Sequence, residues 1–206
     1  NNVGDKKMKE IILILISYLY GSIPFALVIG KLFFNTDIRL SGSGNLGGTN
    51  AGRVLGKPVG LAVIILDASK AMIVVLLTSY LCSVLHINQD LKYICALACV
   101  IGHCWPIFAG FKGGKAVSTA IGYFFAVYPL WALAVLLVFL IILKIFKYVS
   151  LSSVLASLTV LLCTPFMSIS LTGKIVNLFI VLILVYRHIP NLKRIKNHTE
   201  PKIKWM

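Results

Sequence analysis

The sequence predicts an all-α, polytopic integral membrane protein with seven transmembrane helices, two of them short. Hydrophobic residues make up 59% of the 206-residue chain, and charged residues make up only 13%. A soluble domain would contain about 45–50% apolar and about 25% charged residues. The charged residues also gather between long apolar runs. Composition and pattern together indicate a chain that lies mostly within a lipid bilayer.

Seven apolar runs are candidates for bilayer crossings. A helix needs about 20 apolar residues to cross the hydrocarbon core, and a shorter one suffices where protein surrounds it. Five runs meet the full length: 11–34, 59–85, 91–108, 128–145 and 149–171. The other two, 116–127 and 175–186, are short and either cross a thinned region or re-enter the side from which they came. Re-entry of both would leave five crossings and the same cytoplasmic loops.

Basic residues between the runs predict the orientation. With seven crossings and an outside N-terminus, the cytoplasmic loops and C-terminal tail hold most lysines and arginines, as the positive-inside rule requires. These are Arg39, Arg53, Lys57, Lys112, Lys115, Lys144, Lys147, Arg187, Lys193, Arg194, Lys196, Lys202 and Lys204. The outside loops hold Lys92, offset by Asp90, and Lys174. We expect residues 1–10 to be a tag remnant or an extracellular N-terminal extension, and residues 11–206 to form one membrane-embedded domain.

The formal charge of +14 raises the question of an anionic partner. No platform of aromatic and basic side chains accompanies the charge, so we expect no nucleic-acid partner and assign the cations to anionic lipid headgroups. The six carboxylates show no spacing typical of a Mg²⁺ site. The five cysteines are expected to be small buried hydrophobes, with a metal cluster of Cys95, Cys99 and His103 as the less favoured alternative. We expect neither a metal nor a cofactor.

The first of three polar segments is SGSGNLGGTNAGR, residues 41–53. Its glycines permit turns that direct several backbone N–H groups at one point, which makes a nest for an anion. Asn45, Thr49 and Asn50 add neutral donors, and Arg53 adds a planar charged fork suited to phosphate. Gly/Ser composition is also typical of a flexible linker. Because linkers rarely interleave amides with an arginine, we favour the anion site.

The second polar segment, residues 102–119, reads GHCWPIFAGFKGGKAVST. It combines a glycine turn, the two cations Lys112 and Lys115, and a following helix whose first N–H groups and dipole favour an anion. The glycine spacing before Lys115 is one residue short of a P-loop. A phosphate site and a plain positively charged cytoplasmic loop explain the two lysines equally well.

The third polar segment, residues 186–202, reads YRHIPNLKRIKNHTEPK. We interpret Lys193, Arg194 and Lys196 as a basic tail on anionic lipid. His188 and Asn191 differ, because an imidazole at the membrane edge can move protons near neutral pH. These two side chains are therefore candidates for the same site.

One charged pair, Asp67 and Lys70, lies inside the run 59–85 at a spacing of i, i+3. Charges within a membrane are costly, so they are normally functional or paired with each other. We expect a structural ion pair that braces the loops, in preference to direct contact with a substrate.

Together these segments resemble a known family, the bacterial acyl-phosphate:glycerol-3-phosphate acyltransferases, which are integral membrane enzymes of the PlsY type. The resemblance rests on GSIPFA, SGSGNLGGTNAGR, LDASK, GHCWPIFAGFKGGKAVST and RHIPN followed by TEPK, and it covers nearly the whole chain after Met8. It implies seven helices in the bacterial inner membrane, with the site facing the cytoplasm. By motif position it implies substrate-binding roles for Ser43, Asn45, Gly47, Thr49, Asn50, Arg53, Lys112, Lys115, His188 and Asn191, with catalytic roles for Ser43, Lys112, His188 and Asn191.

The resemblance also implies a reaction. Such enzymes transfer a fatty acyl group from an acyl phosphate to the 1-hydroxyl of glycerol 3-phosphate and release lysophosphatidate and inorganic phosphate, the first step of phospholipid synthesis. An acyl phosphate is already activated, so the protein must supply cations and N–H donors more than a strong nucleophile. The base is either His188 or a substrate phosphate with a second pKa of about 6, and we favour the phosphate. A covalent role for Ser43 is the minority hypothesis, because no base partners it in sequence.

Two other functions stay open at this point. Short apolar segments and helix N-termini directed at an anion are also typical of transporters or channels for a phosphate-bearing anion. Such transporters usually have paired halves, and the sequence shows no inverted repeat. The third alternative is a structural protein whose loops only contact lipid headgroups. We expect glycerol 3-phosphate, fatty acyl phosphate and membrane lipid as partners, and a monomer as the functional unit.

Overall fold

The chain folds into helices joined by loops in the computed structural model, which describes residues 2–203. The α-helices are α1 Asn2–Gly21, α2 Phe25–Phe34, α3 Gly48–Val54, α4 Lys57–Leu85, α5 Leu91–Cys104, α6 Val117–Val127, α7 Pro129–Phe146, α8 Val149–Cys163 and α9 Leu171–Lys196, with 3-10 turns η1 Ile38–Leu40, η2 Ile107–Ala109 and η3 Thr164–Phe166. Residues 1 and 204–206 lie outside the described residues. They include Lys204 and the outer ends of the two predicted domains, 1–10 and 11–206. The predicted all-α class is confirmed.

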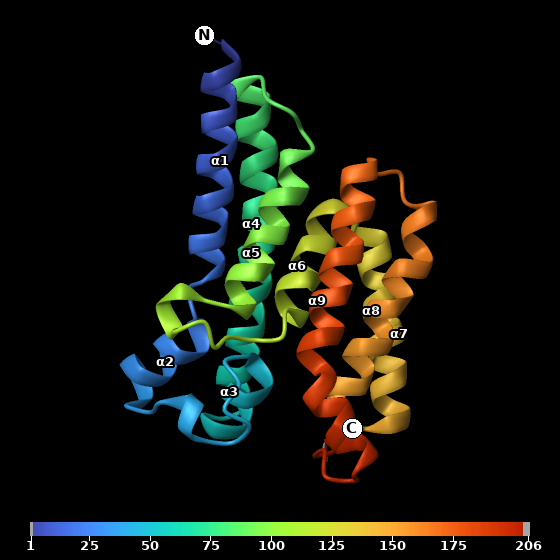
Figure 1. Cartoon of the computed structure of the whole chain (residues 1–206). Coiled ribbons are helices and arrows are strands. Elements are labelled where there is room, and N and C mark those ends of the chain that lie inside the picture. The colour runs from blue at the N-terminus through green and yellow to red at the C-terminus, as the bar shows by residue number, and fades with distance from the viewer. Residues whose placement is uncertain (1, 204–206) are drawn as a thin grey trace.

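Length and hydropathy identify the helices that can cross a bilayer. Five segments qualify singly: Lys57–Leu85, Leu91–Ala109, Pro129–Phe146, Val149–Phe166 and Leu171–Lys196. α1 and α2 qualify as one pair bent by 43°, and α6 is a shorter apolar helix. The two chain ends lie at opposite ends of the bundle, as Figure 1 shows, which fits an odd number of crossings. The described residues therefore form a polytopic membrane bundle.

The predicted run 11–34 is broken between α1 and α2, at residues 22–24. Pro24 has no N–H to donate to the helix, and its ring disfavours helical geometry at the residue before it. The Ser22 hydroxyl donates to the Tyr18 carbonyl at 2.8 Å, at the C-terminal end of α1. Residues 2–10, which we expected to belong to a tag remnant or an N-terminal extension, are helical and continuous with the rest of α1.

The prediction that 175–186 is a short segment is wrong, whereas the short run 116–127 is confirmed as α6. α9 is 26 residues long and continues past Tyr186 through Pro190. Hydropathy ended the predicted run at Tyr186 because polar residues follow, but polar side chains are compatible with a helix. His188 and Asn191 consequently project from a helix instead of a loop.

Close helix packing brings the ends of these elements together. α4 packs against α6 and α5, α1 against α5, and α8 against both α7 and α9. A Cβ atom added at Gly122 of α6 would collide with the backbone carbonyl of Ala68 on α4, so glycine permits this close approach. The Tyr123 hydroxyl donates to Asn177 Oδ1 at 2.8 Å and links α6 to α9.

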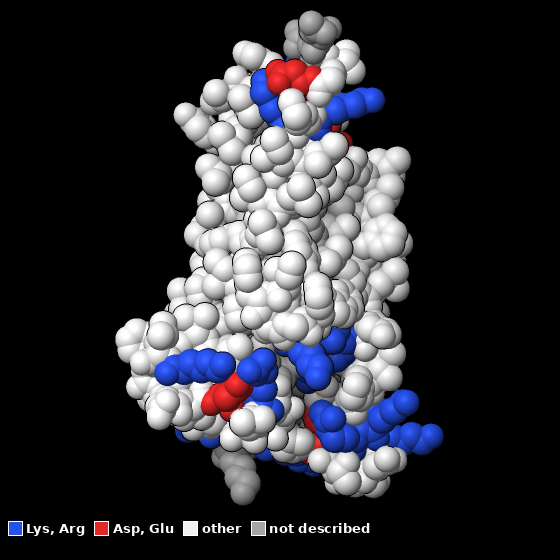
Figure 2. All heavy atoms as spheres, turned by 60° about the vertical axis from the view of Figure 1, so that its left-hand side comes forward, with Lys and Arg blue, Asp and Glu red and all other residues white. Residues whose placement is uncertain are grey.

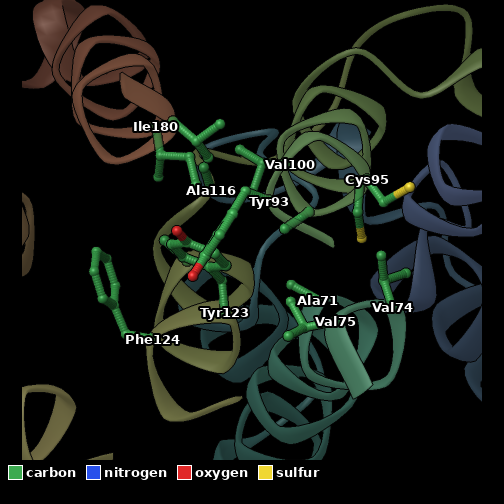
Figure 3. Close-up of a cluster of buried hydrophobic side chains, with 14 of the residues drawn as sticks. Ala71, Val74, Val75, Tyr93, Cys95, Val100, Ala116, Tyr123, Phe124 and Ile180 are labelled. Carbon is green, nitrogen blue, oxygen red and sulfur yellow. The ribbon is translucent and has the colours of Figure 1, made fainter. Parts of the chain in front are cut away.

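The core lies between α4, α5, α6 and α9 (Figure 3). The buried side chains labelled there are Ala71, Val74, Val75, Tyr93, Cys95, Val100, Ala116, Tyr123, Phe124 and Ile180. Dispersion contacts and close packing fix the four helices relative to one another. The polar segments that precede α4, precede α6 and end α9 therefore occupy one end of the bundle, opposite the N-terminus (Figure 1).

Charge is distributed unevenly along the bundle. Figure 2 shows a band without charged side chains between two charged ends. Most of the lysines and arginines visible in that view lie at the end away from the N-terminus. The uncharged band matches the hydrocarbon core of a bilayer.

Candidate active site

A cavity of about 670 Å³ opens where the three polar segments meet. Its polar lining consists of Gly42, Ser43, Asn45, Gly47, Gly48, Thr49, Asn50, Arg53, Asp67, His103, Lys115, Ser118, Ser150, Ser153, His188, Asn191, Arg194, Thr199 and Glu200. Every predicted substrate-binding residue except Lys112 is in this set. Segments that are far apart in sequence thus contribute to one site.

Lys112 lies outside the cavity. Its side chain is exposed on the loop before α6, whereas Lys115, three residues later, lines the cavity. The catalytic role predicted for Lys112 therefore gains no support from its position, and the positive charge of a loop at the membrane surface explains it better.

Asn50 holds the first polar segment in shape. Its Oδ1 accepts a hydrogen bond from the Ser43 N–H at 2.8 Å, and its Nδ2 donates to the carbonyls of Ile38 and Ser41 at 3.1 and 3.2 Å. The side chain is buried. Because these contacts engage both the donor and the acceptor of the amide, Asn50 braces the loop, and its contact with a substrate stays a prediction.

Arg53 and Ser43 lie at the exposed rim of the cavity. Within the described residues, neither side chain makes a hydrogen bond. The Arg53 guanidinium therefore keeps its donors for an anion. No imidazole contacts the Ser43 hydroxyl within residues 2–203, so the covalent hypothesis gains no support.

Lys115 lies at the centre of the polar lining. Its Nζ donates to Asn191 Oδ1 at 2.7 Å, and burial lowers the pKa of Lys115 to about 8. α6 begins two residues later without a side-chain cap, and Val117 and Ser118 from its first turn line the cavity. Free N–H groups and the helix dipole add to the attraction of Lys115 for an anion.

Arg187 fastens α9 to the second polar segment. Its Nε donates to the Gly114 carbonyl at 3.0 Å and its Nη2 to the Gly113 carbonyl at 2.9 Å, while the guanidinium lies 5.6 Å from the Trp105 ring centroid. Asn45 Nδ2 also reaches the Gly113 carbonyl, at 3.4 Å. One carbonyl thereby joins all three polar segments.

Glu200 lines the cavity, although sequence analysis did not make it a candidate site residue. Its Oε1 accepts from Ser150 Oγ and Asn191 Nδ2, each at 2.7 Å, and its Oε2 accepts from Arg194 Nε at 2.8 Å. Burial opposes ionisation, but these hydrogen bonds and the Arg194 charge outweigh it and hold the pKa of Glu200 below its usual value. Arg194 consequently lies at the cavity, in contrast to the lipid contact predicted for it.

His188 is buried on α9, with Nδ1 2.8 Å from the Leu184 carbonyl. A carbonyl oxygen only accepts, so the hydrogen-bonded tautomer carries its proton on Nδ1 and leaves Nε2 as an acceptor. The histidine is thus oriented by its own helix.

Asp67 and Lys70 form the expected ion pair, with 2.8 Å between Lys70 Nζ and Asp67 Oδ1. The structure adds His103, whose Nδ1 lies 3.6 Å from the same oxygen. Asp67 and His103 both line the cavity. The packing of α4 against α5 creates this contact, and no local sequence pattern announces it.

An apolar groove continues from the cavity between α6, α7, α8 and α9. Both spaces share Val117, Ile121, Leu136, Phe139 and Ser153. Deeper in the groove lie Ala120, Phe124, Val135, Ala156, Ser157, Val160, Ile180, Val181 and Leu184. The site therefore has a polar end and an apolar end.

Among the described residues, no group of three or more His, Cys, Asp or Glu side chains is placed to hold a metal ion. Cys82, Cys95, Cys99 and Cys104 are buried, as expected, while Cys163 is partly exposed.

The fold and site define a class: a polytopic membrane protein whose cavity suits a molecule with phosphate at one end and a hydrocarbon chain at the other. The profile of the glycerol-3-phosphate acyltransferase family matches residues 11–198. The chain belongs to this family, which confirms the resemblance found in the motifs.

Relatives and solved structures of this family match almost the full length of the chain. A glycerol-3-phosphate acyltransferase of Listeria welshimeri is 46% identical over 95% of this chain and 98% of its own. One of Staphylococcus aureus is 42% identical over 97% of this chain and 100% of its own. Crystal structures of PlsY (YgiH), an integral membrane glycerol 3-phosphate acyltransferase, match in the glycerol 3-phosphate form (TM-score 0.88, 37% identity) and the lysophosphatidic acid form (TM-score 0.86, 35% identity). Each match covers 95% of this chain and 96% of the other.

Proposed function

We propose that the chain transfers a fatty acyl group from an acyl phosphate to the 1-hydroxyl of glycerol 3-phosphate, producing lysophosphatidic acid and inorganic phosphate. The observation that carries the proposal is the cavity, which joins a polar end containing Arg53 and Lys115 to an apolar groove. The polar end suits phosphates and the groove suits a fatty chain. The two PlsY forms, with glycerol 3-phosphate and with lysophosphatidic acid, agree with the acceptor and the product.

Electrostatics and positioning supply the chemistry. The acceptor hydroxyl must reach the acyl carbonyl while negative charge builds up on the departing phosphate. Lys115 and the first turn of α6 lie where they can neutralise that charge, and Arg53 at the rim holds the second phosphate. Asn191 binds Lys115 through Oδ1 and Glu200 through Nδ2, so it acts on the reaction by positioning the lysine.

A substrate phosphate accepts the proton of the attacking hydroxyl in this proposal. Its second pKa of about 6 allows it to act as a base at neutral pH. His188 Nε2 accepts a hydrogen bond from the acceptor and orients it, because Nδ1 is engaged by Leu184. The oxygen of the 1-hydroxyl then bonds to the carbonyl carbon, the bond between that carbon and the phosphate oxygen breaks, and phosphate leaves with the electron pair.

We infer that the cavity faces the cytoplasm, because its end of the bundle carries the greater share of lysine and arginine. Cysteine labelling in intact cells tests this inference. A Lys57→Cys variant at the cavity end should react with an impermeant thiol reagent only after permeabilisation. A Ser83→Cys variant at the opposite end should react in intact cells, and the reverse pattern would overturn the assignment.

Purified protein given palmitoyl phosphate and glycerol 3-phosphate tests the reaction. We expect inorganic phosphate and lysophosphatidic acid in equal amounts, and background levels of both would refute the proposal. Palmitoyl-CoA or palmitoyl acyl carrier protein in place of the phosphate should give no product. Flux of glycerol 3-phosphate across vesicles without phosphate release would favour the transporter alternative.

A further inference from the structure

Asp67 lines the cavity and has one carboxylate oxygen without a partner among the described residues. The residue is 1% exposed, yet its side chain contributes to the cavity lining. Lys70 Nζ and His103 Nδ1 both approach Oδ1, whereas Oδ2 has no hydrogen-bond partner within the described residues. Buried carboxylate oxygens are normally satisfied, because an unpaired one loses its hydration without compensation. An unpaired acceptor in a binding cavity indicates that a ligand group donates to it.

The chemistry of the cavity restricts that donor. Arg53, Lys115 and the first N–H groups of α6 donate, so they suit phosphate oxygens. A phosphate dianion cannot satisfy Asp67 Oδ2, because both groups only accept hydrogen bonds and both carry negative charge. In the proposed reaction the hydroxyls of glycerol 3-phosphate are the ligand groups that donate.

We propose that Asp67 Oδ2 accepts a hydrogen bond from a hydroxyl of glycerol 3-phosphate and so determines which end of the acceptor enters the cavity first. The inference rests on the proposed function. Phosphate goes to the cationic side and the polyol end goes to Asp67. Asp67 is thereby a residue of acceptor specificity as well as a member of an ion pair.

The surroundings of Asp67 support this role. Lys70 is 1% exposed and balances the carboxylate charge, so the carboxylate does not repel the phosphate across the cavity as an isolated anion would. His103, 7% exposed, packs against Gly114, where any side chain would collide with the imidazole Nε2. The Gly114 N–H donates to the His103 carbonyl at 3.0 Å. Both neighbours of Oδ1 are thus held in place, and Oδ2 is left for the ligand.

Deoxy analogues of the acceptor test the proposal. 3-Hydroxypropyl phosphate lacks the 2-hydroxyl and serves as a substrate, while 2-hydroxypropyl phosphate lacks the 1-hydroxyl and serves as an inhibitor. In the unmodified protein, one of the two should bind at least tenfold more weakly than glycerol 3-phosphate, since a hydrogen bond to a charged group is lost. Equal binding of all three would overturn the inference without any variant.

Asp67→Asn tests the residue itself. We expect the KM for glycerol 3-phosphate to rise about ten- to a hundredfold, as for a lost hydrogen bond to a charged acceptor. KM or Ki for the analogue that lacks the bonded hydroxyl should change less than threefold, and the spared analogue identifies the hydroxyl. An equal penalty for all three compounds, or no penalty for glycerol 3-phosphate, would overturn the proposal.

Two further variants separate recognition from folding. Lys70→Met removes the ion pair and keeps the carboxylate, so it should lower thermal stability but preserve the discrimination between analogues. Asp67→Asn/Lys70→Met avoids an orphaned ammonium and replaces the single variant if that fails to fold. Glycerol 3-phosphate binding, followed by calorimetry without an acyl donor, tests Asp67 even if the acyl-transfer reaction itself is refuted.

Discussion

Two carboxylates line the same cavity and differ in how they are satisfied. Glu200 has both oxygens engaged, by Ser150, Asn191 and Arg194, and its side chain is 6% exposed. Asp67 is more deeply buried, with a side chain that is 2% exposed, and only its Oδ1 is engaged within the described residues. Glu200 follows a helix end at the cavity mouth, whereas Asp67 lies inside α4.

This difference suggests separate roles: Glu200 holds the side chains of the site in place, and Asp67 recognises the ligand. Both oxygens of Glu200 accept hydrogen bonds from protein donors, so Glu200 fixes the position of Asn191 and, through it, that of Lys115. The carboxylate of Asp67 keeps one oxygen without a partner among the described residues, and in our proposal this oxygen binds the substrate hydroxyl. Loss of Glu200 should therefore disturb structure, and loss of Asp67 should disturb selectivity.

The largest effect is expected at the lysine that the Glu200 network positions. Lys115→Met should lower kcat/KM for acyl transfer about 10³-fold, because it removes a cation from the charge that develops in the transition state. Lys112→Met is the matched control, since Lys112 lies outside the cavity, and it should stay within threefold. Steady-state phosphate release measures both, and equal losses would contradict the positions that we assign to the two lysines.

A substitution at Glu200 tests the difference between the two carboxylates directly. Glu200→Gln should lower the free energy of unfolding by about 1.5–3 kcal/mol, because hydrogen bonds to a charged, buried group are weakened. Thermal unfolding in detergent measures the loss, with Glu10→Gln near the N-terminus as a neutral control. Discrimination between glycerol 3-phosphate and its deoxy analogues should be unchanged. If Glu200→Gln altered discrimination instead of stability, the two carboxylates would not differ as proposed.

Substitution of His188 is expected to lower kcat/KM less than substitution of Lys115. If a substrate phosphate is the base, His188→Ala removes one orienting hydrogen bond and lowers kcat/KM about five- to tenfold. Loss of a general base would cost about 10²- to 10⁴-fold. Complete inactivity with glycerol 3-phosphate binding intact would make His188 the base.

The mildest expected effect comes from pH. The protonated form of Lys115 binds phosphate, and its pKa of about 8 in the free protein means that charge is lost as the pH rises through 8. Relative to pH 7, kcat/KM should fall about twofold at pH 8 and about fourfold at pH 8.5. Lys115→Arg keeps its charge throughout this range, so its profile should stay flat. A fall of the same size in Lys115→Arg would assign the titration to another group.

Much of the fold followed from the sequence, because apolar runs of bilayer length admit few structures other than helices. α4, α6 and α7 lie close to the predicted bounds. α9 was underestimated because hydropathy measures burial in lipid and not helix formation, so the prediction stopped where Arg187 begins the polar turns.

The site was predictable where a motif carries both position and chemistry, as at Arg53, Lys115 and His188. It was not predictable where tertiary packing pairs distant residues. His103 meets Asp67 because α4 packs on α5, and Arg194 meets Glu200 because the chain turns back after α9. Asn50 shows the opposite case. It lies in a predicted substrate motif, but its side chain forms hydrogen bonds within its own loop.

The length of the apolar groove limits how well the protein can distinguish acyl chains of different length. Along α8 it extends from Ser153 to Val160, which is about 10 Å at the helical rise. An extended palmitoyl tail is longer than that, so we expect its far methylenes to lie among the lipids. Discrimination between tails should therefore be steep for short ones, where each methylene gains burial, and flat once the tail outgrows the groove. The membrane, more than the protein, would then set the composition of the long-chain products.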